Sequence, residues 1–339
     1  MAPSAHHRWR RIAVRIGLGS VATGIFLWLF LRQVDLGAAW KKMTALPPWT
    51  MLAALGLIFV NVFAMALRWR YLLEGAGYKL SLRRLVSTVC VGRGANNVLP
   101  ARGGDLLRIE SMRELAAVPA FVSAGTLFAE RLLDGVVLAA WIVVGALLLG
   151  EGGELLLTGV ALSAGAVLGI VLVAVAARDP QRTEAFVWRA ARRLPPRWRA
   201  RVGRSTVHFV EGLGAFHGRR RFTLVVLTSI AMWSADVFMY ALVGHAFGLD
   251  LRTGGYFLLD GIGNLALAVP ATAAGLGSFD YLTLLAAKGI NVPADKATAY
   301  VLTMHALAVL PITILGALLI RPAFPRVFHR GEPAGQEGG

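Results

Sequence analysis

The stretch "NNVLPARGGDLLR", residues 96–108, places a proline, two glycines, an aspartate and two arginines between apolar segments. Pro100 cannot continue the hydrogen-bond ladder of a helix, and Gly103 and Gly104 tolerate the backbone angles of a turn. Asp105 then stands where the N-cap of a second helix is expected. The stretch therefore predicts a helical hairpin over residues 85–115 instead of one continuous helix.

The composition around this hairpin is that of a membrane protein. Of 339 residues, 56% are hydrophobic and 16% are charged. A helix needs about 20 apolar residues to cross roughly 30 Å of hydrocarbon. Six segments are long enough, and the first of them exceeds the apolar part of a signal peptide, so we expect it to be retained. They are residues 12–31, 49–67, 119–149, 154–177, 222–248 and 298–320.

Lys and Arg are distributed unequally between the two sides of these spans. The N-terminus, residues 68–84, residues 178–221 and the C-terminus hold 24 Lys and Arg against 6 Asp and Glu, whereas the opposite loops hold five of each. This positive-inside bias predicts that both termini are cytoplasmic. Attraction to anionic lipids accounts for the 12 Arg of residues 178–221, so we expect no nucleic-acid partner.

A second broken segment, "GNLALAVPATAAGLGSFDYLTLLAAKGI", residues 263–290, repeats the order of parts of the first. An Asn, an apolar run, a Pro, small residues and an acid follow one another in both. An odd number of spans separates the two segments, so they are expected to enter from opposite faces, as in transporters with inverted repeats. The matching residues are Asn97, Pro100 and Asp105 in the first segment and Asn264, Pro270 and Asp280 in the second.

The predicted fold class is therefore all-α, a polytopic membrane helix bundle of about six full spans and two re-entrant helical hairpins in an inverted repeat. An interfacial amphipathic helix with a solvated charged face is the alternative for residues 85–115. The first repeat covers residues 1–150. The second repeat covers residues 151–321 and contains an Arg-rich cytoplasmic loop at 178–221 and a hairpin at 254–290 that enters from the outer side. Residues 322–339 are predicted to be a flexible cytoplasmic tail.

Charged side chains at membrane depth cost roughly 2.5 to 3.5 kcal/mol each, so a cluster of them marks a candidate site. Several arginines beside the start of a half-helix can hold a phosphate. Glu130 and Asp134 can instead form an internal ion pair with Arg102 or Arg108, and both roles stay open. The predicted substrate-binding residues are Arg93, Asn97, Arg102, Asp105, Arg108, Glu130, Arg131, Asp134 and Asp280; the turn residues are Pro100, Gly103, Gly104, Pro270, Gly275 and Gly277; Asp236 and His305 are candidates for a proton relay.

Other chemistries find little support in the sequence. Cys90 is the only cysteine, so neither a disulfide framework nor a cysteine-based metal site can form. The phosphate-binding pattern of ATPases, GxxxxGK[ST], is absent. We therefore expect no metal, no cofactor and no ATP hydrolysis by this chain.

The segments "GRGANNVLPARGGDLLR" (92–108), "AERLLD" (129–134) and "GLGSFD" (275–280) resemble those of the lysylphosphatidylglycerol synthase transmembrane-region family. The resemblance covers nearly the whole chain. It implies a flippase-like membrane domain of the kind found in bacterial aminoacyl-phosphatidylglycerol synthases and in proteins of hopanoid biosynthesis. The family pattern has Glu where Asp280 stands and often Arg near His305. The soluble aminoacyl-transferase domain is absent, so we expect no synthesis of lysyl-lipid.

The leading functional hypothesis is a lipid translocase that moves a phospholipid, a polyprenyl-phosphate or another amphiphilic lipid between leaflets, and not an enzyme. Arg102 and Arg108 would hold the head group, while Glu130 and Asp134 would balance charge or relay protons. One alternative is a membrane-embedded lipid-modifying enzyme that uses Asp105, Glu130 and Asp134 around a metal. The other is a non-transporting partner of enzymes of lipid or glycan synthesis, recruited through the Arg-rich loop.

Overall fold

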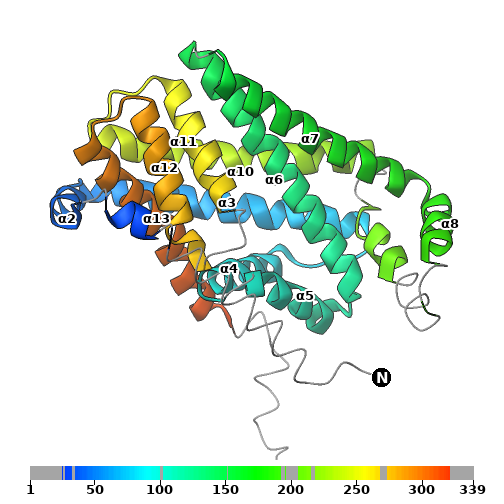
Figure 1. Ribbon diagram of the computed structural model, residues 1–339. Coiled ribbons are helices and arrows are strands. Elements are labelled where there is room, and N and C mark those ends of the chain that lie inside the picture. Colours follow the sequence, from blue (N-terminus) through cyan, green and yellow to red (C-terminus); the bar gives the residue numbers. More distant parts are fainter. Residues whose placement is uncertain are drawn as a thin grey trace, which may run out of the picture.

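The structure is a computed structural model that describes residues 25, 27–32, 35–99, 102–150, 152–191, 195, 205–214, 218–267 and 273–320. Within these ranges every regular element is a helix, as predicted (Figure 1). The helices are α2 (Leu36–Thr44), α3 (Pro48–Gly75), α4 (Leu82–Val98), α5 (Gly103–Ala116), α6 (Ala120–Leu149), α7 (Glu154–Arg178), α8 (Pro180–Ala191), α10 (Arg219–Ala246), α11 (Thr253–Ala266), the 3-10 helix η3 (Ala273–Gly275), α12 (Ser278–Gly289) and α13 (Ala294–Leu318).

Five helices are long and apolar enough to cross a membrane: α3, α6, α7, α10 and α13. They correspond to five of the six predicted spans, and the protein is a multi-pass membrane protein. Most of the sixth predicted span, residues 12–31, lies outside the described residues, as does the predicted tail at 322–339. Of the Arg-rich loop at 178–221, the structure describes α8 and residues 205–214 among others.

Each of the two broken segments folds as a pair of short helices that pack on one another, α4 with α5 and α11 with α12. The longest of the four, α4, has 17 residues. At a rise of 1.5 Å per residue it extends about 25 Å, less than the roughly 30 Å of hydrocarbon. Both breaks are thus confirmed, although Pro100 and Pro270 lie outside the described residues.

The geometry of the first turn differs from the prediction. Arg102, and neither glycine, has the left-handed backbone (φ 56°), and it precedes α5. Gly103 and Gly104 lie in the first turn of α5, where a Cβ on Gly104 would overlap the carbonyl oxygen of Gly92 in α4. Gly104 therefore serves the close approach of two helices. Asp105 is the third residue of α5 and not its N-cap.

The second turn does use its glycines as expected. Gly275 and Gly277 both have positive φ, 72° and 82°. The carboxylate of Asp280 accepts a hydrogen bond from the backbone N–H of Gly277 at 3.0 Å and so secures the start of α12. The two hairpins therefore share a layout but reverse the chain with different residues.

The helices of the two halves pack in a reciprocal pattern. α3 runs along α10, and in the view of Figure 1 α4 and α5 lie below α3, whereas α11 lies above it. α4 packs on α13, and α11 packs on α6, so each hairpin packs against a span of the other half. The contact of α4 with α13 is more extensive than that with its own hairpin partner α5. An inverted repeat would produce this reciprocal packing, in which each hairpin contacts a span of the other half. The repeat itself remains a prediction.

Small residues bring these reciprocal pairs close together, as is common between membrane helices. A Cβ on Gly316 of α13 would lie 2.6 Å from the carbonyl oxygen of Cys90 in α4. A Cβ on Gly254 of α11 would lie 2.6 Å from the carbonyl oxygen of Gly145 in α6. The backbones therefore meet at both contacts, which fixes the hairpins against the spans.

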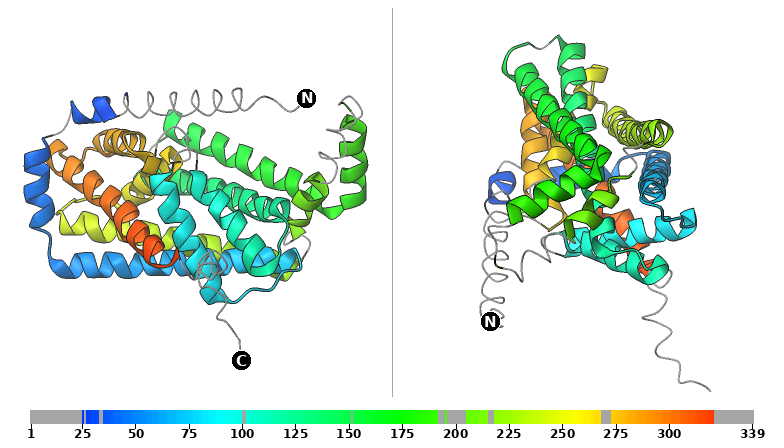
Figure 2. Two further views of the ribbon diagram at one scale, coloured as in Figure 1. Left: turned by 90° about the horizontal axis from the view of Figure 1, so that it is seen from below. Right: turned by 90° about the vertical axis from the view of Figure 1, so that its right-hand side faces the viewer.

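Helix α7 is the most exposed of the spans. It packs on α6 along the outer edge of the molecule (Figure 2), and only 6% of the residues in its most apolar stretch are buried. Leu157, Leu168 and Leu172 point outward. In a bilayer these side chains face lipid, so α7 borders the bundle without lining its interior.

Candidate functional site

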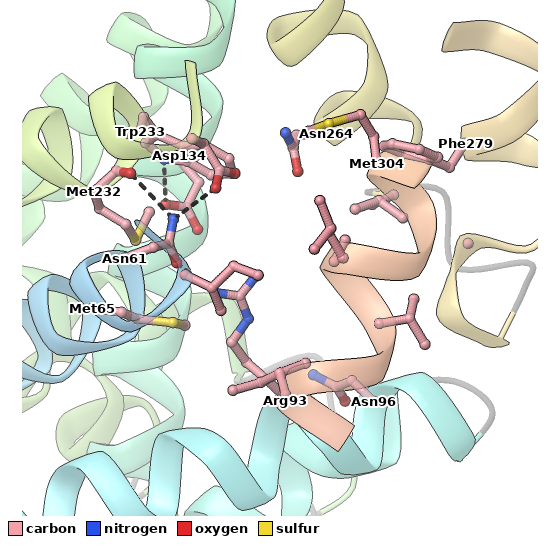
Figure 3. A pocket seen from close by; sticks show the side chains of 18 of the residues that line it. Asn61, Met65, Arg93, Asn96, Asp134, Met232, Trp233, Asn264, Phe279 and Met304 are labelled. Carbon is pink, nitrogen blue, oxygen red and sulfur yellow. Dashed lines mark hydrogen bonds between the residues drawn. The ribbon is translucent and has the colours of Figure 1, made fainter. Parts of the chain in front are cut away.

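A cavity of about 430 Å³ lies between the two hairpins and the spans α3, α6, α10 and α13 (Figure 3). Apolar side chains such as Met65, Leu138 and Met304 form much of its wall. Its polar lining comes from both halves of the chain, which brings the two broken segments to one site. The polar lining residues are Asn61, Arg93, Asn96, Asn97, Arg102, Arg131, Asp134, Asp236, Tyr240, Asn264 and His305.

Arg93 reaches the cavity from α4 and is held by an amide instead of a carboxylate. Its Nη1 donates to Oδ1 of Asn61 in α3 at 2.7 Å. The Asn61 amide nitrogen donates in turn to Oδ1 of Asp236 at 3.2 Å and to the carbonyl oxygen of Met232 at 3.1 Å (Figure 3). Asp236, a predicted relay residue, therefore meets Arg93 through Asn61.

Arg102 connects the two hairpins. Its Nη2 donates to the carbonyl oxygen of Leu267, just after α11, at 3.0 Å. Among the described residues, neither Arg102 nor Arg93 has a carboxylate within 4.0 Å of its guanidinium nitrogens. The cavity therefore contains two guanidinium groups that are bound only to neutral oxygens, and such groups attract an anion.

Arg131, by contrast, is neutralised within the protein. It contacts Asp105 at 3.2 Å and Asp134 at 3.5 Å. Asp134 also accepts from Arg68 of α3 at 2.7 Å and from the indole N–H of Trp233 at 3.1 Å. This chain of ion pairs joins α5, α6, α3 and α10 along one wall of the cavity.

Arg108 and Glu130 form a second ion pair, behind the cavity. Two hydrogen bonds, at 2.8 and 3.1 Å, join the guanidinium to the carboxylate, and both side chains are buried. The Arg108 guanidinium also lies 3.9 Å from the centre of the Trp69 ring. The structure thus shows Glu130 in the internal ion pair that was one of its two predicted roles.

The second hairpin is tied to α13 by a histidine. Nδ1 of His305 lies 2.6 Å from Oδ1 of Asp280, and Nε2 lies 3.1 Å from the carbonyl oxygen of Ala274 in η3. His305 and Ala274 line the cavity, whereas Asp280 lies behind them. In α11, Asn264 donates to Asp260 at 2.8 Å.

The predicted site residues thus separate into two groups. Those at the cavity are Arg93, Asn97, Arg102, Arg131, Asp134, Asp236, Gly275 and His305. Those that do not line it are Gly103, Gly104, Asp105, Arg108, Glu130, Gly277 and Asp280.

Asn61, Asn96, Asn264 and Arg68 were not among the predicted site residues. The first three line the cavity, and Arg68 binds Asp134. Arg68 is fully buried inside α3, which continues to Gly75, so its assignment to a cytoplasmic loop at residues 68–84 is wrong. Nowhere in the described ranges do three or more His, Cys, Asp or Glu side chains gather as metal ligands would.

A multi-pass helix bundle with a polar, cation-bearing cavity at the meeting point of two hairpins defines the class of this protein. The chain belongs to the lysylphosphatidylglycerol synthase transmembrane-region family, whose model matches residues 12–316. The family resemblance of the sequence is thereby confirmed.

Two named proteins are similar to this chain. The glycosyltransferase AglD of Haloferax volcanii is 27% identical over 347 residues, a match that covers 91% of this chain and 54% of that protein. A UPF0104 membrane protein of Methanocaldococcus jannaschii is 29% identical over 90 residues, or 26% of each chain. The chain therefore spans about half the length of the first relative and about a quarter of the second.

Proposed function

We propose that the protein moves a phosphate-bearing lipid between the leaflets of a bacterial cytoplasmic membrane, with both termini in the cytoplasm. The observation that carries the proposal is the pair of arginines, Arg93 and Arg102, that reach one cavity and have no carboxylate partner within the part of the chain that the structure describes. A phosphate bears the charge and the acceptor oxygens that two guanidinium groups bind best. The substrate would be an anionic phospholipid or a polyprenyl-phosphate.

The surroundings of the arginines suit an amphiphile. The wall that holds Arg93 and Arg102 is polar, whereas Met65, Leu138 and Met304 provide apolar surface beside it. A head group can therefore occupy the polar part while its chains remain against apolar side chains and lipid. The ion pairs of Arg131 and Arg108 take no part in binding and keep the wall rigid.

Reconstitution into liposomes tests the proposal. Wild type is expected to translocate fluorescent phospholipid or polyprenyl-phosphate. Arg93→Gln and Arg102→Gln should each slow translocation by roughly 10-fold or more, because a charged hydrogen bond contributes about 1.5–3 kcal/mol. Arg113→Gln is the matched control, since Arg113 is exposed on the same hairpin, away from the cavity lining, and its guanidinium forms a surface ion pair with Glu110 at 2.7 Å.

The same experiment separates the alternatives. Equal rates for wild type and the three variants would show that Arg93 and Arg102 do not bind the transported lipid. No transport by wild type would contradict the proposal that the protein is a translocase. Chemical conversion of the lipid by purified protein in detergent, where no leaflets exist, would indicate an enzyme instead.

A second candidate function follows from the relative that is named a glycosyltransferase. The match covers only 54% of AglD, so a membrane domain of this kind can accompany catalysis located elsewhere in that protein. We propose as the alternative that this chain assists enzymes of lipid or glycan synthesis without transport. Loss of activity in cells on removal of residues 178–221, together with full activity of Arg102→Ala, would favour this alternative.

A further inference from the structure

His305 stands between two oxygen acceptors. Its Nε2 lies 3.1 Å from the carbonyl oxygen of Ala274, and a carbonyl oxygen can only accept a hydrogen bond. Nε2 must therefore carry a hydrogen. The other ring nitrogen, Nδ1, lies 2.6 Å from Oδ1 of Asp280, which is a short contact that also needs a hydrogen between the two atoms.

These two contacts together require one more proton than a neutral imidazole and an ionised carboxylate supply. If the extra proton is on Nδ1, the ring is an imidazolium paired with a carboxylate. If it is on Asp280, a carboxylic acid donates to a neutral ring. The second oxygen of Asp280 is already an acceptor from Gly277, so the proton belongs to the Oδ1···Nδ1 contact.

The pair is buried but open to the cavity on one side. Asp280 is 2% exposed and His305 is 8% exposed, and the ring of Phe279 lies 5.1 Å from the imidazole. His305 and Ala274 line the cavity, so the proton can exchange there. The charged groups that share the cavity with His305 are Arg93 of α4, Arg102 before α5, Arg131 and Asp134 of α6, and Asp236 of α10.

We infer that Asp280 and His305 form a proton-binding site that fastens the second hairpin to α13 and couples its position to the anionic lipid in the cavity. When the pair loses one proton, the ring keeps a single N–H and can serve only one of the two oxygens. Either the contact with Ala274 or that with Asp280 is then lost, and η3 or α12 is released from α13.

The coupling to the lipid rests on the proposed function. A phosphate bound by Arg93 and Arg102 adds negative charge to the cavity that His305 lines, which favours the protonated pair. By linkage, a protonated pair must then strengthen phosphate binding by the same factor. Such coupling would let a proton gradient across the membrane drive movement of the bound lipid, with the proton carried alongside the phosphate.

The protonation of the pair can be measured without transport. Nitrogen NMR of ¹⁵N-histidine-labelled protein in nanodiscs assigns the His305 ring by its loss in His305→Gln, and His245→Gln is the matched control because His245 is exposed on α10. At neutral pH we expect either an imidazolium, or a ring protonated at Nε2 together with an infrared carboxylic-acid band that Asp280→Asn removes. A neutral ring beside an ionised Asp280, whichever ring nitrogen carries the hydrogen, would overturn the inference.

The coupling is tested by the affinity for a short-chain polyprenyl-phosphate as a function of pH. The phosphate itself titrates, so His305→Gln, whose amide can still donate to Ala274, gives the baseline. Relative to it, the wild-type affinity should fall with rising pH by up to roughly tenfold per unit, the limit for one proton. Parallel pH profiles would overturn the coupling and leave the translocase standing. No binding by wild type at any pH would contradict the proposed function, while the NMR result still decides whether the site holds a proton.

Discussion

The first hairpin brings Arg93, Asn96, Asn97 and Arg102 to the cavity, whereas the second brings Asn264, Ala274, Gly275 and Phe279. The first is held to α6 by ion pairs of arginine with carboxylate, Arg108 with Glu130 and Arg131 with Asp105. The second is held to α13 by Asp280 and His305 alone among the described ion pairs. Similar layouts thus carry different charges, which gives the cavity one wall that attracts anions.

This difference suggests a division of roles between the hairpins. The ion pairs of the first hairpin, Arg108 with Glu130 and Arg131 with Asp105, join α5 to α6 and hold the hairpin in place. The contact of α12 and η3 with α13 includes the pair of Asp280 and His305, whose two hydrogen bonds depend on how many protons the pair holds. We therefore expect the first hairpin to bind the head group, and η3 and α12 of the second hairpin to move.

The largest expected effect is on the buried ion pair of the first hairpin. Glu130→Ala leaves the Arg108 guanidinium buried without its carboxylate, which should lower the free energy of unfolding by about 3–5 kcal/mol. Glu110→Ala is the control, because Glu110 forms a surface pair with Arg113 on the same hairpin. Thermal unfolding in detergent measures both. Equal midpoints for the two variants would contradict a structural role for Glu130.

A smaller effect is expected from the backbone contact within the first hairpin. Gly104→Ala places a Cβ against the carbonyl oxygen of Gly92, so α4 and α5 must separate, at a cost of about 1–3 kcal/mol. Gly56→Ala in α3 is the control, since a Cβ there meets nothing within 4 Å. Urea or thermal unfolding in detergent compares them. If Gly104→Ala is as stable as Gly56→Ala, the close packing of the hairpin does not matter for stability.

The smallest effect is expected at Asp105. Its partner Arg131 is 37% exposed at the side chain and also contacts Asp134, so Asp105→Asn should change the free energy of unfolding by no more than about 1 kcal/mol. The same substitution at Asp280 should cost more, because that pair is almost fully buried. A larger loss at Asp105 than at Asp280 in the same unfolding assay would reverse the proposed ranking of the two contacts.

Much of the fold could be predicted because lipid imposes length and polarity on every span. The apolar runs at 49–67, 119–149, 154–177, 222–248 and 298–320 all became helices of sufficient length. The breaks at residues 96–108 and 263–280 were visible because Pro, Gly and charge interrupt apolar sequence. Helix ends were harder to predict. α3 continues eight residues past the predicted end of its span. The prediction ended the span where charged residues begin, at Arg68, whereas the helix continues through Arg68 and Arg70.

The site was predicted less completely, for a physical reason. Charged residues in an apolar segment are conspicuous, and Arg93, Arg102 and Asp134 were found in this way. Asn61 is uncharged and lies within a long apolar span, so the sequence does not mark it, although it holds Arg93. Asn264 was noticed as part of the repeated pattern but not as a site residue. Sequence also could not show which acid pairs with which base, since Arg68 and Asp134 are 66 positions apart.

The extensive contact of α4 with α13 has a consequence for biogenesis. Nearly 200 residues separate the end of α4 from the start of α13. At a translation rate of roughly 5–20 residues per second, the arginine-bearing helix leaves the ribosome roughly 10–40 s before its main neighbour exists. During that interval it must be sheltered by the insertion machinery or wait at the membrane surface, so assembly of the first half is completed only when a helix of the second half has been made.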